Sequence, residues 1–183
     1  MNKKPILYAD DDTESILELI KIRFPSLIVG LFLGIIISLL ISKFEQLISA
    51  NVQLAFFLPF IVYLSDAVGT QTQTIYTREL RMGKATFSIY LIKELLLGII
   101  IGLFSALISG SIVQLWLGDE LLTISIALSV FAATATAPLI AVLVTRVMSA
   151  LRTDPAAGSG PIDTVIQDMV SVLIFFFICN AIL

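Results

Sequence analysis

Two aspartates stand out because each lies inside a long apolar stretch of the sequence. Asp168 lies in the last of these stretches, seven residues after Pro161, and Asp66 lies in the second. A carboxylate at membrane depth costs about 2.5 to 3.5 kcal/mol even on the forgiving insertion scales, so such a residue is a candidate functional group by default. The chemistry that it most often performs is binding of a metal ion or a proton.

Each aspartate shares a helical face with other polar side chains. Residues three, four or seven positions apart lie on the same side of an α-helix, and the pattern repeats along it. Two sets follow this spacing: Asp66, Thr70, Gln73 and Thr77 in the second stretch, and Pro161, Thr164, Asp168 and Ser171 in the last. Threonine and glutamine alone are also common where helices pack in a bilayer. The carboxylates favour a stripe that lines an ion pathway, because a charged group faces protein or water and not lipid.

The segment before the last apolar stretch contains another acid among helix breakers. Pro155, Gly158, Gly160 and Pro161 predict non-helical backbone beside Asp154. Free carbonyls and carboxylates are the ligands that hard divalent cations prefer. The alternative is a simple loop in which Asp154 caps a turn.

Asp163 is interpreted differently from Asp168. It precedes Asp168 by five residues, which is roughly 140° around a helix. Its side chain should therefore point elsewhere, and we expect it to cap the start of the last helix.

The composition predicts an integral membrane protein. Apolar residues make up 58% of the 183 residues, charged residues make up 14%, and the mean hydropathy is +1.03. These values exclude a soluble globular domain with a polar surface. Cys179 is the single cysteine and the chain has no histidine, which excludes an intrachain disulfide and a Cys/His metal cluster. Any metal site must use oxygen ligands, which suit Mg²⁺, Ca²⁺ or Mn²⁺.

Five stretches are long and apolar enough to cross about 30 Å of hydrocarbon as helices. They cover residues 25–42, 50–70, 87–117, 122–147 and 162–183. In this topology ten of the eleven Lys and Arg residues lie on one side of the membrane, and only Lys43 lies on the other. The positive-inside rule therefore predicts a cytoplasmic N-terminus and, after five spans, an external C-terminus. The expected fold is an all-α integral membrane domain.

The chain divides at the start of the first span. Residues 1–24 are expected to form a short cytoplasmic acidic segment, with Asp10-Asp11-Asp12 leading into an amphipathic helix over 16–23, and residues 25–183 form the five-helix domain. We interpret the acids as a solvated cap near the positive end of the helix dipole. The alternative is that they gather cations at the cytoplasmic mouth or form a vestigial plug.

Three motifs resemble the membrane domain of the MgtE-type divalent cation transporters. Asp154-Pro155-Ala156, Ser159, Pro161, Thr164 and Asp168 match the family signature DPA..S.P..T...D at the same spacing. Residues 68–73 and 78–80 look like the family's GGN.G.Q followed by R.L, and Arg23-Phe24-Pro25 is similar to the R.PW that opens its first helix. The similarity covers roughly residues 15–183.

The resemblance implies a homodimer with five helices per protomer, a pore along the two-fold axis between protomers, and Mg²⁺ as the usual transported ligand. It implies that Asp168 is the pore aspartate, paired with its symmetry mate, and that Asp154 lies at the cytoplasmic mouth. The predicted metal-binding residues are Asp168, Asp154, Asp66, Thr164, Gln73 and Thr70. Elementary electrostatics agree, because a two-fold axis turns one carboxylate into two, and two neutralise one divalent ion.

The sequence departs from the family's pattern in three respects, of which one is that Thr145 stands where the family has a proline late in the fourth helix. Ser65-Asp66-Ala67 stands where the family has GGN, so an amide ligand is missing and an acid stands one position earlier. This change could alter ion selectivity or couple transport to Na⁺ or H⁺. The family's usual cytosolic regulatory and CBS domains, which sense Mg²⁺, are not expected here, because only about 24 residues precede the first span. Regulation would then fall to a separate protein.

We therefore predict a divalent cation transporter of the cell membrane, with no enzymatic activity, no cofactor and no nucleic-acid partner. Its partners would be a second copy of the chain, membrane lipid and the metal ion. One alternative is a Na⁺- or H⁺-coupled exchanger of another divalent cation. From other classes, the alternatives are a non-transporting membrane subunit and an intramembrane aspartyl protease, although neither intramembrane aspartate has the GxGD or YD context of such a protease.

Overall fold

The computed structural model describes residues 12–150 and 160–183, and all regular structure in these residues is helical. The helices are α1 (Ile16–Ser42), α2 (Glu45–Ala50), α3 (Leu54–Arg81), α4 (Phe87–Leu117), α5 (Glu120–Ala150) and α6 (Gly160–Ile182). Five of them, all except α2, are long and apolar enough to cross a membrane. The prediction of an all-α domain is confirmed, and five helices have the length and apolar character that the predicted spans require.

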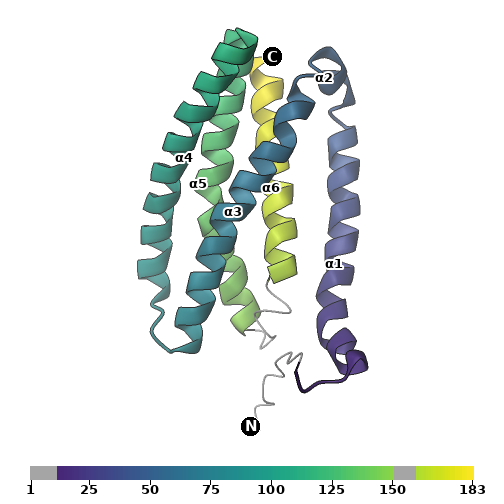
Figure 1. Ribbon diagram of the computed structural model, residues 1–183, viewed down its shortest axis with the longest axis vertical. Coiled ribbons are helices and arrows are strands. Elements are labelled where there is room, and N and C mark those ends of the chain that lie inside the picture. Colours follow the sequence, from purple (N-terminus) through teal and green to yellow (C-terminus); the bar gives the residue numbers. More distant parts are fainter. Residues whose placement is uncertain (1–11, 151–159) are drawn as a thin grey trace.

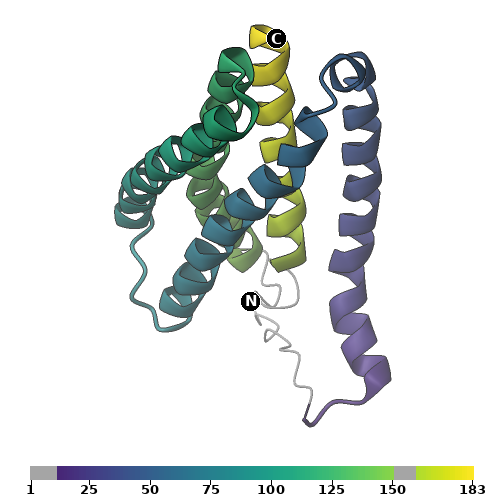
Figure 2. The same cartoon turned by 45° about the horizontal axis from the view of Figure 1, so that its top comes forward.

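The four helices α3 to α6 form a bundle, and α1 stands at its edge (Figure 1). Helix α5 packs against α3, α4 and α6, whereas α1 packs on α6. Helices α1 and α3 are separated along most of their lengths in both views (Figure 1 and Figure 2). Phe44, in the turn between α1 and α2, stacks on Phe176 of α6 with ring centroids 4.7 Å apart. This contact ties the end of α1 to the bundle.

The apolar core fills the half of the bundle that contains the start of α3 and the end of α6. Its fully buried members include Leu54 and Ile61 of α3, Ile126 of α5, and Phe175 and Phe176 of α6. The candidate polar residues lie from the middle of the same two helices toward their other ends. The core therefore fixes the crossing of α3 and α6 without occupying the polar region.

The helix bounds differ from the predicted spans in three places. The segment over 16–23 is continuous with the first span in α1, whose start is capped by Ser15 and Glu18. Helix α3 ends at Arg81 and not at residue 70, because a helix can continue through polar residues beyond its apolar stretch. A short helix, α2, lies between the first two predicted spans, where the sequence predicted no helix. Hydropathy marks what lipid can contact, whereas caps and packing set where a helix ends.

The start of α1, the end of α3 and the end of α5 lie at one end of the bundle, opposite Leu183 at the C-terminus (Figure 1). The described Lys and Arg residues belong to this end, except Lys43, which follows α1 at the other end. The helix arrangement thus agrees with the predicted charge asymmetry. The assignment of the basic end to the cytoplasm remains a prediction.

Candidate functional site

The two predicted polar stripes lie on helices that contact each other, α3 and α6. On these helices Asp66, Thr164 and Asp168 are half-buried, Thr70 is exposed and Gln73 is buried. The stripe of α3 is therefore exposed at Thr70, whereas Gln73 at its other side lies beside Gly160 at the start of α6. Asp154, the remaining predicted ligand, lies outside the described residues.

Three carboxylates on these helices interact electrostatically. The Asp66 carboxylate of α3 acts on both Asp163 and Asp168 of α6. Within residues 12–150 and 160–183, no group of three or more Asp, Glu, His or Cys side chains is arranged to hold a metal ion. A metal at this surface must therefore recruit other oxygen atoms, from amides, hydroxyls, water or a second copy of the chain.

The expectation that Asp163 caps the last helix is wrong. Helix α6 begins at Gly160, so Asp163 lies inside its first turn. Its side chain is only 1% exposed, and its Oδ2 accepts a hydrogen bond of 2.7 Å from Nε2 of Gln167. The sequence held one signal of this arrangement, because Asp and Gln four residues apart pair on a helix. Asp163 does differ from Asp168 in direction, since Asp168 is half-buried.

Gln167 fits against a glycine of α3. Its side chain is 1% exposed, and a Cβ built on Gly69 would overlap its amide group. Gly69 follows Asp66 by three residues, so both lie on the side of α3 that meets α6. The absence of a side chain at Gly69 allows the amide of Gln167 to reach the backbone of α3.

A neighbouring face of α3 packs against α5 and contacts α4. Ser65 donates a hydrogen bond of 3.2 Å from Oγ to the carbonyl of Ala133 in α5, and Thr72 donates one of 2.7 Å from Oγ1 to Oε2 of Glu94 in α4. Small polar residues of α3 thus do form a packing seam, on a different face from the predicted stripe. These bonds hold α3 against α5 and α4 and so fix the direction in which the stripe faces.

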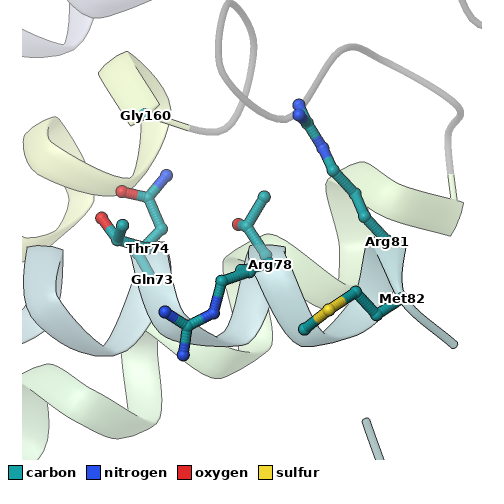
Figure 3. Close-up of a pocket in the computed structure, with 7 residues that line it drawn as sticks. Gln73, Thr74, Arg78, Arg81, Met82 and Gly160 are labelled. Carbon is teal, nitrogen blue, oxygen red and sulfur yellow. The ribbon is translucent and has the colours of Figure 1, made fainter. Parts of the chain in front are cut away.

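A pocket of about 480 Å³ lies at the end of the stripe, where α3 passes the start of α6. It is lined by Gln73, Thr74, Thr77, Arg78, Arg81, Met82 and Gly160. Figure 3 shows Gln73 and Thr74 beside the start of α6, with the two arginines further along α3. The pocket therefore joins the polar stripe to the basic end of the bundle.

The sequence of these helices matches a known protein family. A family model described as MgtE, divalent cation transporter, matches residues 58–178, a range that contains both Asp66 and Asp168. The chain belongs to the MgtE family. It is 32% identical over 162 residues to the magnesium transporter MgtE of Bacillus subtilis and 34% identical over 161 residues to that of Enterococcus faecalis. To the magnesium transporter MgtE of Thermus thermophilus it is 26% identical over 165 residues.

The matches cover 86 to 87% of this chain but only 35 to 36% of each relative. The chain thus spans about a third of the length of these MgtE relatives. Membership of the family, together with the five helices long enough to cross a bilayer, makes it a multi-pass membrane protein. The resemblance deduced from the three motifs is confirmed.

Proposed function

We propose that this MgtE-family chain transports a divalent cation, most readily Mg²⁺, through a pore between two copies of itself. The relatives in Bacillus subtilis and Enterococcus faecalis are both named magnesium transporters. The site contains carboxylate, hydroxyl and amide oxygens, which are the ligands of hard cations. No part of this proposal requires an enzymatic step.

The observation that carries the proposal is the polar surface that a single protomer leaves uncovered on α3 and α6. Thr70 is exposed, and Asp66, Thr164 and Asp168 are half-buried, on helices long and apolar enough to span the bilayer. Such a surface is costly against lipid, where an aspartate alone costs about 2.5 to 3.5 kcal/mol. A second copy related by a two-fold axis would cover it with an identical polar surface and enclose water.

The same symmetry supplies the charge that a divalent cation needs. Asp168 and its symmetry mate would provide two negative charges, and Thr164 would add a hydroxyl from each copy. Mg²⁺ dehydrates reluctantly and usually keeps several waters, so a pore wide enough for water suits it better than a closed cage. Asp66, which interacts electrostatically with Asp168, would raise the local cation concentration. Asp154 would act at the entrance.

A flux assay tests the transport function directly. Liposomes that contain the purified protein and an entrapped Mg²⁺-sensitive dye should take up Mg²⁺ when it is added outside, with no Na⁺ present and equal pH on both sides. Protein-free liposomes are the control. Uptake that appears only with a Na⁺ or pH gradient would favour the exchanger alternative. No uptake under any of these conditions would contradict transport.

Cross-linking tests the two-copy pore. The free Cys179 is buried, so we would replace it by serine and introduce Asp168→Cys as the single cysteine. In membranes, a short bifunctional thiol reagent should convert this protein into a covalent dimer, because the two-fold axis places the two thiols across one narrow pore. Ile100→Cys, at a residue of α4 that is 68% exposed, serves as the control and should remain monomeric. Equal cross-linking of the two variants would contradict the Asp168 axis.

A further inference from the structure

Three buried oxygen atoms on the facing sides of α3 and α6 lack a hydrogen-bond partner. They are Oδ1 of Asp66, Oδ1 of Asp163 and Oε1 of Gln167, and no donor reaches them within the described residues. Asp163 and Gln167 are each 1% exposed. Buried polar atoms are nearly always satisfied, so three acceptors without a donor in one region call for an explanation.

The three side chains form one group. Gln167 donates its amide hydrogen to Oδ2 of Asp163, which leaves Oδ1 of Asp163 and its own Oε1 available. The Gln167 amide lies against Gly69, one helical turn from Asp66 on α3. Asp66 in turn interacts electrostatically with Asp163. The group therefore bridges the two helices inside a single protomer.

The group also carries a charge that the described part of the chain does not balance. No ion pair joins Asp66 or Asp163 to a Lys or Arg in residues 12–150 and 160–183. Asp163 lies in the first turn of α6, where the helix dipole offsets only part of one charge. Burying carboxylates without a compensating cation costs several kcal/mol for each. A proton or a cation from solution could each stabilise the group, but one proton shared between two of the three oxygen atoms leaves the third without a donor, whereas a cation can contact all three.

We propose that each protomer holds a divalent cation between α3 and α6, bound by Asp66, Asp163 and the amide oxygen of Gln167. Two carboxylates neutralise one divalent ion, and an all-oxygen ligand set suits a hard cation that completes its shell with water. This inference rests on the proposed function, because it adds a second site to the same ion pathway. The two sites differ in number: this one occurs once in every chain, whereas the Asp168 pair forms one site between two chains.

The second site would act on the first through Asp66. Its carboxylate interacts with both Asp163 and Asp168, so a cation bound between the helices weakens the field that Asp66 exerts on a cation at Asp168. Neighbouring cations also repel each other, which helps an ion to leave a site that binds it well. Filling of the intraprotomer site should therefore lower the affinity of the Asp168 site.

Counting bound Mn²⁺ tests the proposal independently of transport. We would measure Mn²⁺ bound to the purified detergent-solubilised protein by equilibrium dialysis, in choline buffer, and confirm competition by Mg²⁺. The wild type should bind one ion per chain plus one ion per pair of chains. Asp163→Asn should lose the ion counted per chain and keep the shared ion. Asp168→Asn should lose the shared ion and keep the other.

Two further variants separate binding from folding. Gln167→Glu retains an oxygen ligand and adds charge, so it should keep the ion and bind it more tightly, by about tenfold if the added charge contributes about 1.4 kcal/mol. Gly69→Ala alters no ligand, but its Cβ would displace the Gln167 amide, so it should weaken the ion counted per chain. All variants would be compared only where size-exclusion profiles and thermal unfolding show folded protein.

The possible failures of the two proposals differ. If Asp163→Asn and Gln167→Glu bind Mn²⁺ as the wild type does, the intraprotomer site is refuted while transport through the Asp168 pair stands. The divalent assignment is refuted if three results coincide: Na⁺ stabilises the wild type against unfolding, Asp163→Asn removes that stabilisation, and Mn²⁺ does not bind at the intraprotomer site. If Asp168→Asn changes neither Mn²⁺ binding nor Mg²⁺ flux, the proposed pore itself is refuted.

Discussion

Asp168→Asn should reduce Mg²⁺ flux through the reconstituted protein by at least about 100-fold. The substitution removes both negative charges of the proposed pair at once, and a loss of about 2.7 kcal/mol of cation stabilisation corresponds to that factor. Asparagine has nearly the same shape as aspartate. The hydrogen bond from Ser171 reaches the backbone carbonyl of Asp168, so it survives the change. The measurement is dye-reported Mg²⁺ uptake into liposomes at equal protein density.

The matched control is Glu45→Gln, which neutralises an exposed acid in α2 at the other end of the bundle. It should leave flux within about twofold of the wild type, because an exposed charge beyond a Debye length of roughly 10 Å is screened by salt. If Asp168→Asn conducts Mg²⁺ as the wild type does, the proposed role of Asp168 is refuted. A similar fall in Glu45→Gln would point to a general effect of negative charge on the protein.

The helices and the two polar stripes could be predicted from the sequence because both depend on local patterns. Apolar length indicates a span, and helical spacing groups Asp66 with Thr70 and Thr164 with Asp168. The structure adds that the two stripes lie on neighbouring helices. Their joint role as metal ligands remains a prediction.

The position of Asp163 could not be predicted in the same way. Proline and glycine residues before α6 place its start only within several residues, and a shift of three residues turns a cap into a buried side chain. The contact between Gln167 and Gly69 depends on how closely α3 and α6 approach. That distance is set by packing across the whole bundle, which no local pattern contains.

The sequence of α4 also contains a pattern of small residues, but the pattern does not identify the helix that these residues contact. Gly98, Gly102, Ala106 and Gly110 are spaced four residues apart in α4, and all are buried. Small residues at this spacing allow helices to approach closely in a bilayer. The sequence alone does not say which helix they face. In the structure that helix is α5, which also accepts the hydrogen bond of Ser65 that positions α3.

Gly98→Ala and Gly102→Ala should each lower the free energy of unfolding by about 1 to 3 kcal/mol, the usual cost of overpacking. A Cβ at Gly98 would lie 2.8 Å from the carbonyl oxygen of Ala135, and one at Gly102 would lie 2.9 Å from that of Phe131. Both neighbours are backbone atoms of α5, so relief requires movement of a whole helix. Gly110→Ala should have a smaller effect, because the nearest atom is the Cβ of Ala127 at 3.2 Å. Thermal unfolding in detergent measures the series.

Gly30→Ala and Gly34→Ala in α1 are the matched controls, since a Cβ at either position meets no atom within 4 Å. They should be neutral or stabilising by about 0.5 to 1 kcal/mol, because alanine favours a helix interior more than glycine does. Displacement of α5 would also move Ala133, which accepts the hydrogen bond of Ser65, the neighbour of Asp66. The Gly98 and Gly102 variants should therefore lose Mg²⁺ flux at temperatures where they are still folded. Unchanged flux and stability in both would show that close packing of α4 on α5 does not position the polar face of α3.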